Sequence, residues 1–179
     1  MRLASTLSLL AILVAAPCLA EEAASDPSAV PAARTQLGDW VAICNAAPSA
    51  ERQQCEADIS LSVDAQPEPV ARVAFYAEGK GQPVRLVAIV KANLTLAPGV
   101  EIAADGGKTS FTLPFKSCLN SACLSDLDLT SEQVETFRAS RESARLTITN
   151  AGGEKLSTQI SPKGLKEALD MVTGPAPAK

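Results

Sequence analysis

The segment CEADISLSV, residues 55–63, alternates apolar and polar side chains along its whole length. A period of two is typical of a β-strand with one face in the core and the other in solvent. Seven further segments have strand character: 39–44, 70–78, 84–92, 100–103, 109–115, 144–150 and 155–160. Turn sequences such as Gly79-Lys80-Gly81 separate them. About eight short strands at regular spacing predict a mainly β protein folded as a β-sandwich.

Two short helices are expected beside the strands. The pattern T-x-x-Q that begins at Thr130 has the form of a capping box and predicts a helix through about Ala139. The dipeptide Ser161-Pro162 predicts a second helix, with proline at its first position, through about Val172. The apolar residues at 165, 168, 169 and 172 share one face of that helix, so it should pack on a sheet.

The ends of the chain differ in composition from the strand-rich part. Residues 1–20 have the form of a secretory signal peptide, with Arg2 before an apolar run and small residues ahead of the cleavage point. An Ala/Pro/Ser-rich stretch at 21–35 is expected to be a flexible linker, and 173–179 a disordered tail. The folded domain is therefore predicted at 36–172, in the periplasm or on the cell surface, with no transmembrane anchor after cleavage.

Four cysteines remain after the predicted cleavage: Cys44, Cys55, Cys118 and Cys123. An even number in an exported chain predicts two disulfides. Of the three pairings, we favour Cys44 with Cys55 and Cys118 with Cys123, because each pair is close in sequence and lies at the ends of what look like short turns. Zinc is the alternative, but the spacings do not match those of zinc ribbons. The sequence therefore predicts two local disulfides and no metal.

Catalytic motifs are missing from the sequence. There is no histidine anywhere in the chain, which removes the usual general base and most nucleophile systems. Asp126 and Asp128 alternate on an extended segment and could share a calcium ion, as could Glu56 and Asp58. The competing interpretation is a solvated face, with the leucines at 124, 127 and 129 as buried partners. We expect no enzyme and no cofactor.

Charge and the single tryptophan limit the partners. The net charge is −4 and no run of Lys or Arg occurs, which disfavours nucleic acid as a partner. Trp40 precedes Cys44 by four residues. It is expected in the core against a disulfide, and its alternative role is an exposed anchor for a partner.

A series of short motifs runs in order from about residue 37 to residue 169. They are Gly38-Asp39-Trp40 with Cys44 after it, Gln54-Cys55, Leu96-Ala97-Pro98-Gly99-Val100, Asp105-Gly106, Pro114-Phe115 with Cys118 and Cys123, and Ser161 with Gly164-Leu165 and Ala168-Leu169. With these motifs the chain resembles the invasion-associated locus B family of exported bacterial proteins. Two positions depart from the family pattern: Ala122 replaces a glycine and Leu165 replaces a phenylalanine.

The resemblance implies a small, immunoglobulin-like β-sandwich with both cysteine pairs oxidised, exported to the periplasm or outer surface. It also implies a link to host-cell invasion in some pathogens, and it carries no catalytic residues. Our leading hypothesis is a non-enzymatic binding module for an unidentified protein or envelope component. Its rivals are a structural or envelope-stress protein without a specific ligand, and a calcium-dependent hydrolase that uses surface carboxylates. Exposed sheet edges favour a homodimer.

Overall fold

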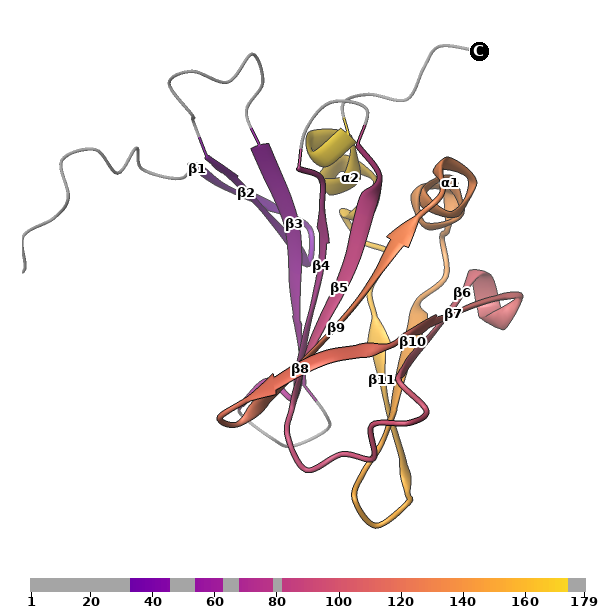
Figure 1. Ribbon diagram of the computed structural model, residues 1–179. Helices are drawn as coiled ribbons and strands as arrows, with labels where there is room; N and C mark the ends of the chain where they lie inside the picture. The colour runs from indigo at the N-terminus through magenta and orange to yellow at the C-terminus, as the bar shows by residue number, and fades with distance from the viewer. Residues whose placement is uncertain (1–32, 46–53, 63–67, 79–81, 174–179) are drawn as a thin grey trace, which may run out of the picture.

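The computed structural model of the chain describes residues 33–45, 54–62, 68–78 and 82–173 (Figure 1). The expected signal peptide, the linker up to residue 32, the turn at 79–81 and the tail from residue 174 lie outside these ranges. Within the described parts, no helix has the length and apolar character needed to span a bilayer.

Eleven strands of the described residues form two antiparallel sheets that face each other (Figure 1). The seven-stranded sheet has the order β1-β2-β3-β4-β5-β9-β8 and the four-stranded sheet the order β11-β10-β6-β7. The strands are β1 (Ala33–Leu37), β2 (Trp40–Asn45), β3 (Gln54–Leu61), β4 (Ala71–Tyr76), β5 (Val84–Lys91), β6 (Val100–Ala104), β7 (Thr109–Leu113), β8 (Phe115–Leu119), β9 (Ala122–Leu129), β10 (Ala144–Thr149) and β11 (Lys155–Ile160). The predicted mainly β sandwich is confirmed.

The core lies between the two sheets. Along β5, Val84, Leu86, Ala88 and Val90 are buried while the residues between them are half-buried, as a period of two requires. A chain of aromatic rings crosses the core from Trp40 on β2 through Phe75 and Phe137 to Phe111 on β7, with ring centroids 5.0 to 5.7 Å apart. The rest of the core is built from smaller aliphatic residues. These few large rings therefore make the long contacts that connect one sheet to the other.

Both helices lie at the same end of the sandwich (Figure 1). Helix α1 (Ser131–Ala139) begins with the predicted capping box, in which the Gln133 backbone N–H donates to Thr130 Oγ1 and the Thr130 N–H donates to Gln133 Oε1. Helix α2 (Leu165–Thr173) packs its predicted apolar face against β2 and β3. It begins at Leu165, later than predicted, because Gly164 directly before it has a φ of 88°, which is not a helical conformation. A single 3-10 turn, η1 (Asp105–Gly107), joins β6 to β7.

Three strands of the structure were not among those predicted: the edge strands β1 and β8, and β9, whose aspartates were placed only on an extended segment. Strand β1 begins at Ala33, so the last three residues of the predicted linker belong to the sheet. Its sequence has no apolar alternation, and it is held by pairing with β2 across the two-residue turn Gly38-Asp39. Strand β8 was also missed, because it too is almost fully exposed and is joined by a hairpin to β9, the next strand of the chain. Edge strands bury little, so they leave a weak pattern in the sequence.

Both predicted disulfides are present. Cys44 and Cys55 lie directly opposite each other on β2 and β3, and Cys118 and Cys123 do so on β8 and β9. Each therefore joins neighbouring strands of the same sheet. This pairing overturns the zinc alternative, since all four sulfurs are used.

The two disulfides should differ in their rate of reduction. Cys44 and Cys55 are both buried, whereas Cys118 is exposed at the end of its hairpin. Because a thiolate must reach one sulfur to open a disulfide, a mild thiol reductant should open Cys118–Cys123 roughly tenfold faster than Cys44–Cys55. Timed alkylation and peptide mass spectrometry would measure both rates. Equal rates, or faster opening of the buried pair, would contradict this prediction.

Candidate functional site

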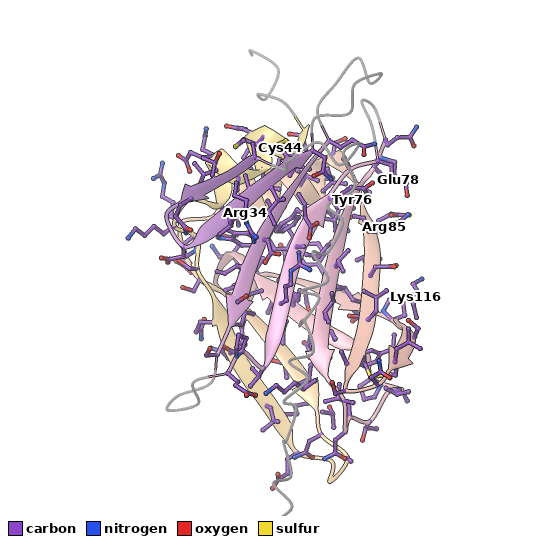
Figure 2. The ribbon with its side chains drawn as sticks, turned by 90° about the vertical axis from the view of Figure 1, so that its left-hand side faces the viewer. Arg34, Cys44, Tyr76, Glu78, Arg85 and Lys116 are labelled. Carbon is purple, nitrogen blue, oxygen red and sulfur yellow. A yellow bond between two sulfur atoms is a disulfide. The ribbon has the colours of Figure 1, made fainter. Side chains whose placement is uncertain are left out.

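The seven-stranded sheet has one face in the core and one face open, here called the outer face. No helix or strand of the described residues packs against the outer face, which Figure 2 shows from the front. Tyr76 and Arg85 lie on adjacent strands near its upper end, Lys116 lies toward the β8 edge and Arg34 toward the β1 edge. Three hollows of the described surface lie here or at its rim. The outer face is therefore the candidate site.

The antiparallel register aligns the outer face into three rows across the strands. The first row is Arg34, Ile43, Glu56, Tyr76, Arg85 and Asp128. The second is Gln36, Val41, Asp58, Ala74, Val87 and Asp126. The third is Ser60, Arg72, Ile89, Leu124 and Ser117. Apolar and charged side chains thus alternate across the surface, and most of the apolar ones are only half-buried.

Arg72 organises the middle of the outer face. Its Nη2 donates to Glu56 Oε1 at 2.6 Å and its Nε donates to Asp58 Oδ2. Asp58 is nearly buried, with 12% of its side chain exposed, so this ion pair is partly shielded from water. The guanidinium is therefore fixed in place, and it presents a rigid planar group between the hollows on either side.

Two hollows flank Arg72. The first, of about 260 Å³, is lined mainly by the apolar Ala74, Val87 and Ile89 together with Tyr76. The second, of about 520 Å³, lies toward the β1 edge and is lined by Arg34, Asp39, Val41, Ile43, Asp58, Ile59, Ser60 and Arg72. Tyrosine and arginine are the residue types that most often anchor protein partners. The outer face thus offers one mainly apolar hollow beside an aromatic ring and one more polar hollow, with a fixed guanidinium between them.

The paired carboxylates of the calcium hypothesis lie on this face, but each has a basic partner. Asp128 accepts a hydrogen bond from Arg85 Nε at 2.9 Å, and this hydrogen bond and its charge raise the pKa of Arg85. Asp126 lies 3.5 Å from Lys116. Within the described ranges no three His, Cys, Asp or Glu side chains gather as a metal set. Leu124 shares the outer face with the two aspartates, so the prediction that it is buried was wrong.

Trp40 is not an exposed anchor. Its side chain is fully buried, its ring lies 5.7 Å from that of Phe75, and its Nε1 donates to the backbone oxygen of Ser161 at 2.8 Å. This corrects the hypothesis that a partner contacts it. The interpretation that placed it in the core is the one that the structure bears out.

The first and last motifs of the resemblance meet at one junction. The turn between β1 and β2 contacts the turn before α2, where Ser161 Oγ donates to Asp39 Oδ2 at 2.6 Å and the Asp39 N–H donates to the Lys163 carbonyl at 3.0 Å. Gly164, with a φ of 88°, lies directly against the Leu37 carbonyl. These residues therefore lock two distant segments together, and their role is structural.

The residues of the outer face were largely missed by sequence reasoning. Of them, only the carboxylates of β3 and β9 were considered, for metal binding. A signal was present in β5, where Val87 and Ile89 are apolar although they fall between the core positions. A strand that is apolar on both faces, in a sheet covered on one face only, indicates a second contact surface.

The comparisons with known proteins agree with the geometry. The family model described as the invasion-associated locus B protein matches residues 40–173. The crystal structure of the invasion-associated protein B from Bartonella henselae is similar, with a TM-score of 0.64 and 19% identity over 78% of this chain and 94% of that one. At that identity the likeness shows the fold alone. No curated protein matches the sequence.

Proposed function

Because the chain belongs to the invasion-associated locus B family, we propose that it is an exported, non-enzymatic binding module of the bacterial periplasm or cell surface. Its partner is a protein of the envelope or of a host cell, and its binding surface is the outer face. The observation that carries this proposal is the open sheet face itself, on which half-buried apolar side chains surround Tyr76 and Arg72.

Export is supported by the covalent chemistry of the fold. Both disulfides persist only in an oxidising compartment, and the first twenty residues have the composition of a signal peptide. Two disulfides within one sheet also stabilise the fold by restricting the unfolded chain.

The ion pairs of the acidic side chains on the outer face support binding rather than catalysis. The carboxylates at positions 56, 58, 126 and 128 are held by Arg72, Lys116 and Arg85. General acid and base catalysis needs a carboxyl group that can exchange a proton with a substrate, whereas each of these four is already engaged by a basic side chain. Fixed, neutralised charges instead set orientation and exclude mismatched partners.

A photoreactive amino acid at position 87 tests the proposal in living cells. Val87 lies in the apolar hollow, so irradiation should join the chain to a second protein and give a discrete adduct. Adding Tyr76→Ala should weaken this adduct roughly tenfold or more, since truncation of an interface hot spot costs about 2 kcal/mol. The adduct is measured by immunoblot and identified by mass spectrometry.

The matched control is the same amino acid at position 156. Leu156 is 45% exposed on β11, in the other sheet, and should give no discrete adduct. Equal adducts at positions 87 and 156, or none at position 87, would rule out the outer face as the binding surface.

A further inference from the structure

The described sheets end in four edge strands, and one of them, β1, has a single charged residue, Arg34, and no other feature that prevents pairing. Strand β8 carries a bulge between Phe115 and Ser117 and the charged Lys116, β11 begins with Lys155, and β7 is followed directly by Pro114. These are the usual devices that prevent a sheet edge from pairing with another chain. Strand β1 has no bulge, lysine or proline, and its residues 33–36 are exposed.

The free backbone groups of β1 can be assigned from the turn that follows it. Leu37 and Trp40 flank a two-residue turn, so they form a hydrogen-bonded pair. Hydrogen-bonded pairs alternate along an antiparallel ladder, so Thr35 also bonds to β2. The N–H and C=O groups of Arg34 and Gln36 therefore point away from the sheet, toward any chain that approaches this edge.

We propose that β1 pairs with β1 of a second copy of this chain, antiparallel and centred on Thr35, to form a symmetric dimer. In this register Arg34 of one protomer lies opposite Gln36 of the other. By the twofold symmetry, Gln36 of the first protomer lies opposite Arg34 of the second. The outward groups of both residues then make four hydrogen bonds between the protomers. Thr35 faces itself on the twofold axis in a non-hydrogen-bonded pair, which is a favourable combination in sheets.

The charges select this register over its neighbours. Sliding the pair by one step toward the N-terminus places Arg34 opposite Arg34, and like charges directly opposite each other destabilise a sheet. Sliding it the other way places Gln36 opposite itself and moves Arg34 across from the turn residue Gly38. Only the pairing centred on Thr35 lets the outward N–H and C=O groups of both Arg34 and Gln36 form hydrogen bonds without placing two arginines opposite each other.

The dimer has a consequence for the outer face. The larger hollow lies beside β1, lined by Arg34, Val41 and Ile43. Strand pairing across the twofold axis places the two copies of this hollow next to each other on one continuous sheet surface. The pairing itself depends only on the edge of β1, so it holds or fails independently of the partner proposed for the outer face.

A cysteine at position 35 tests the register. Directly opposite residues in a non-hydrogen-bonded pair suit a disulfide, as Cys44 and Cys55 do within this fold at a Cα–Cα distance of 4.1 Å. The Thr35→Cys variant of the exported protein should form a covalent dimer under mild oxidation, read by mass on a non-reducing gel. Ser157→Cys, on the edge strand β11 that Lys155 protects, is the matched control and should run at monomer mass on the same gel. Equal crosslinking of the two variants would overturn the proposed register.

Analytical ultracentrifugation tests the dimer without a crosslink. The wild-type chain should sediment at twice its monomer mass. Gln36→Pro removes an outward N–H while leaving the ladder to β2 intact, so it should raise the dimer dissociation constant roughly a hundredfold with an unchanged circular dichroism spectrum. A wild-type chain that stays monomeric as its concentration rises, or a Gln36→Pro dimer as tight as the wild type, would overturn the proposal.

Discussion

Gly164→Ala is expected to lower the free energy of unfolding by about 4 kcal/mol, which is a large share of the stability of a domain of this size. Two separate costs contribute. The residue has a φ of 88°, which an alanine adopts only with strain. An added Cβ would also overlap the carbonyl oxygen of Leu37, which belongs to the strand β1 that the junction holds in place.

The overlap cannot be relieved by a side-chain movement. The atoms that a Cβ would meet are the backbone atoms of Leu37 and Gly38, so either β1 or the start of α2 must shift. Such a shift would also break the hydrogen bonds between Ser161 and Asp39 and between Trp40 and Ser161. The loss of stability should therefore come with a change in tryptophan fluorescence in the folded state.

Gly153→Ala is the matched control for this prediction. Gly153 has nearly the same φ, 86°, but an added Cβ would have no atom within 4 Å. This variant should lose only the conformational part, about 1 kcal/mol. Urea unfolding of both variants measures the difference. If the two variants lose the same amount, the close packing of the junction does not contribute to stability.

The strands that bury one full face could be predicted from the sequence. The alternation at 55–63 marks β3, and Thr130 with Gln133 marks the start of α1, because burial and capping each leave a regular pattern in the chain. Local disulfides were also predictable, since each pair is close in sequence and lies on adjacent strands. All of these features are determined by residues that lie close together in the sequence.

Features that depend on distant segments could not be predicted in the same way. The start of α2 was placed too early because the conformation of Gly164 is determined by its contact with β1, more than a hundred residues before it. The outer face was missed because each of its rows combines five or six strands, and no short segment contains more than a few of its residues. The register of a sheet is a property of pairing, which a single strand does not reveal.

The contact between the two helices rests on one buried charge. Arg138 on α1 is 8% exposed, and its guanidinium contacts Asp170 on α2 and lies 2.9 Å from Glu135. Its Nη2 donates to Thr173 Oγ1 at 2.8 Å, which in turn donates to the Leu169 carbonyl. A buried cation is stabilised only while its carboxylates remain, and Asp170, which is less exposed than Glu135, depends more on the cation in return.

Arg138→Ala should therefore lower the free energy of unfolding by about 3 kcal/mol, because it leaves Asp170 without its main partner and opens space between the helices. Arg141→Ala, at an exposed position just after α1, is the control and should change stability by less than about 0.5 kcal/mol. The double variant Arg138→Ala with Asp170→Ala should lose roughly 2 kcal/mol less than the sum of the single variants, since the second change removes a carboxylate that has already lost its buried partner and keeps only the more exposed Lys166. Chemical denaturation of the four proteins gives this coupling energy. A value near zero would mean that Arg138 stabilises the helix contact through its aliphatic stem rather than through its charge.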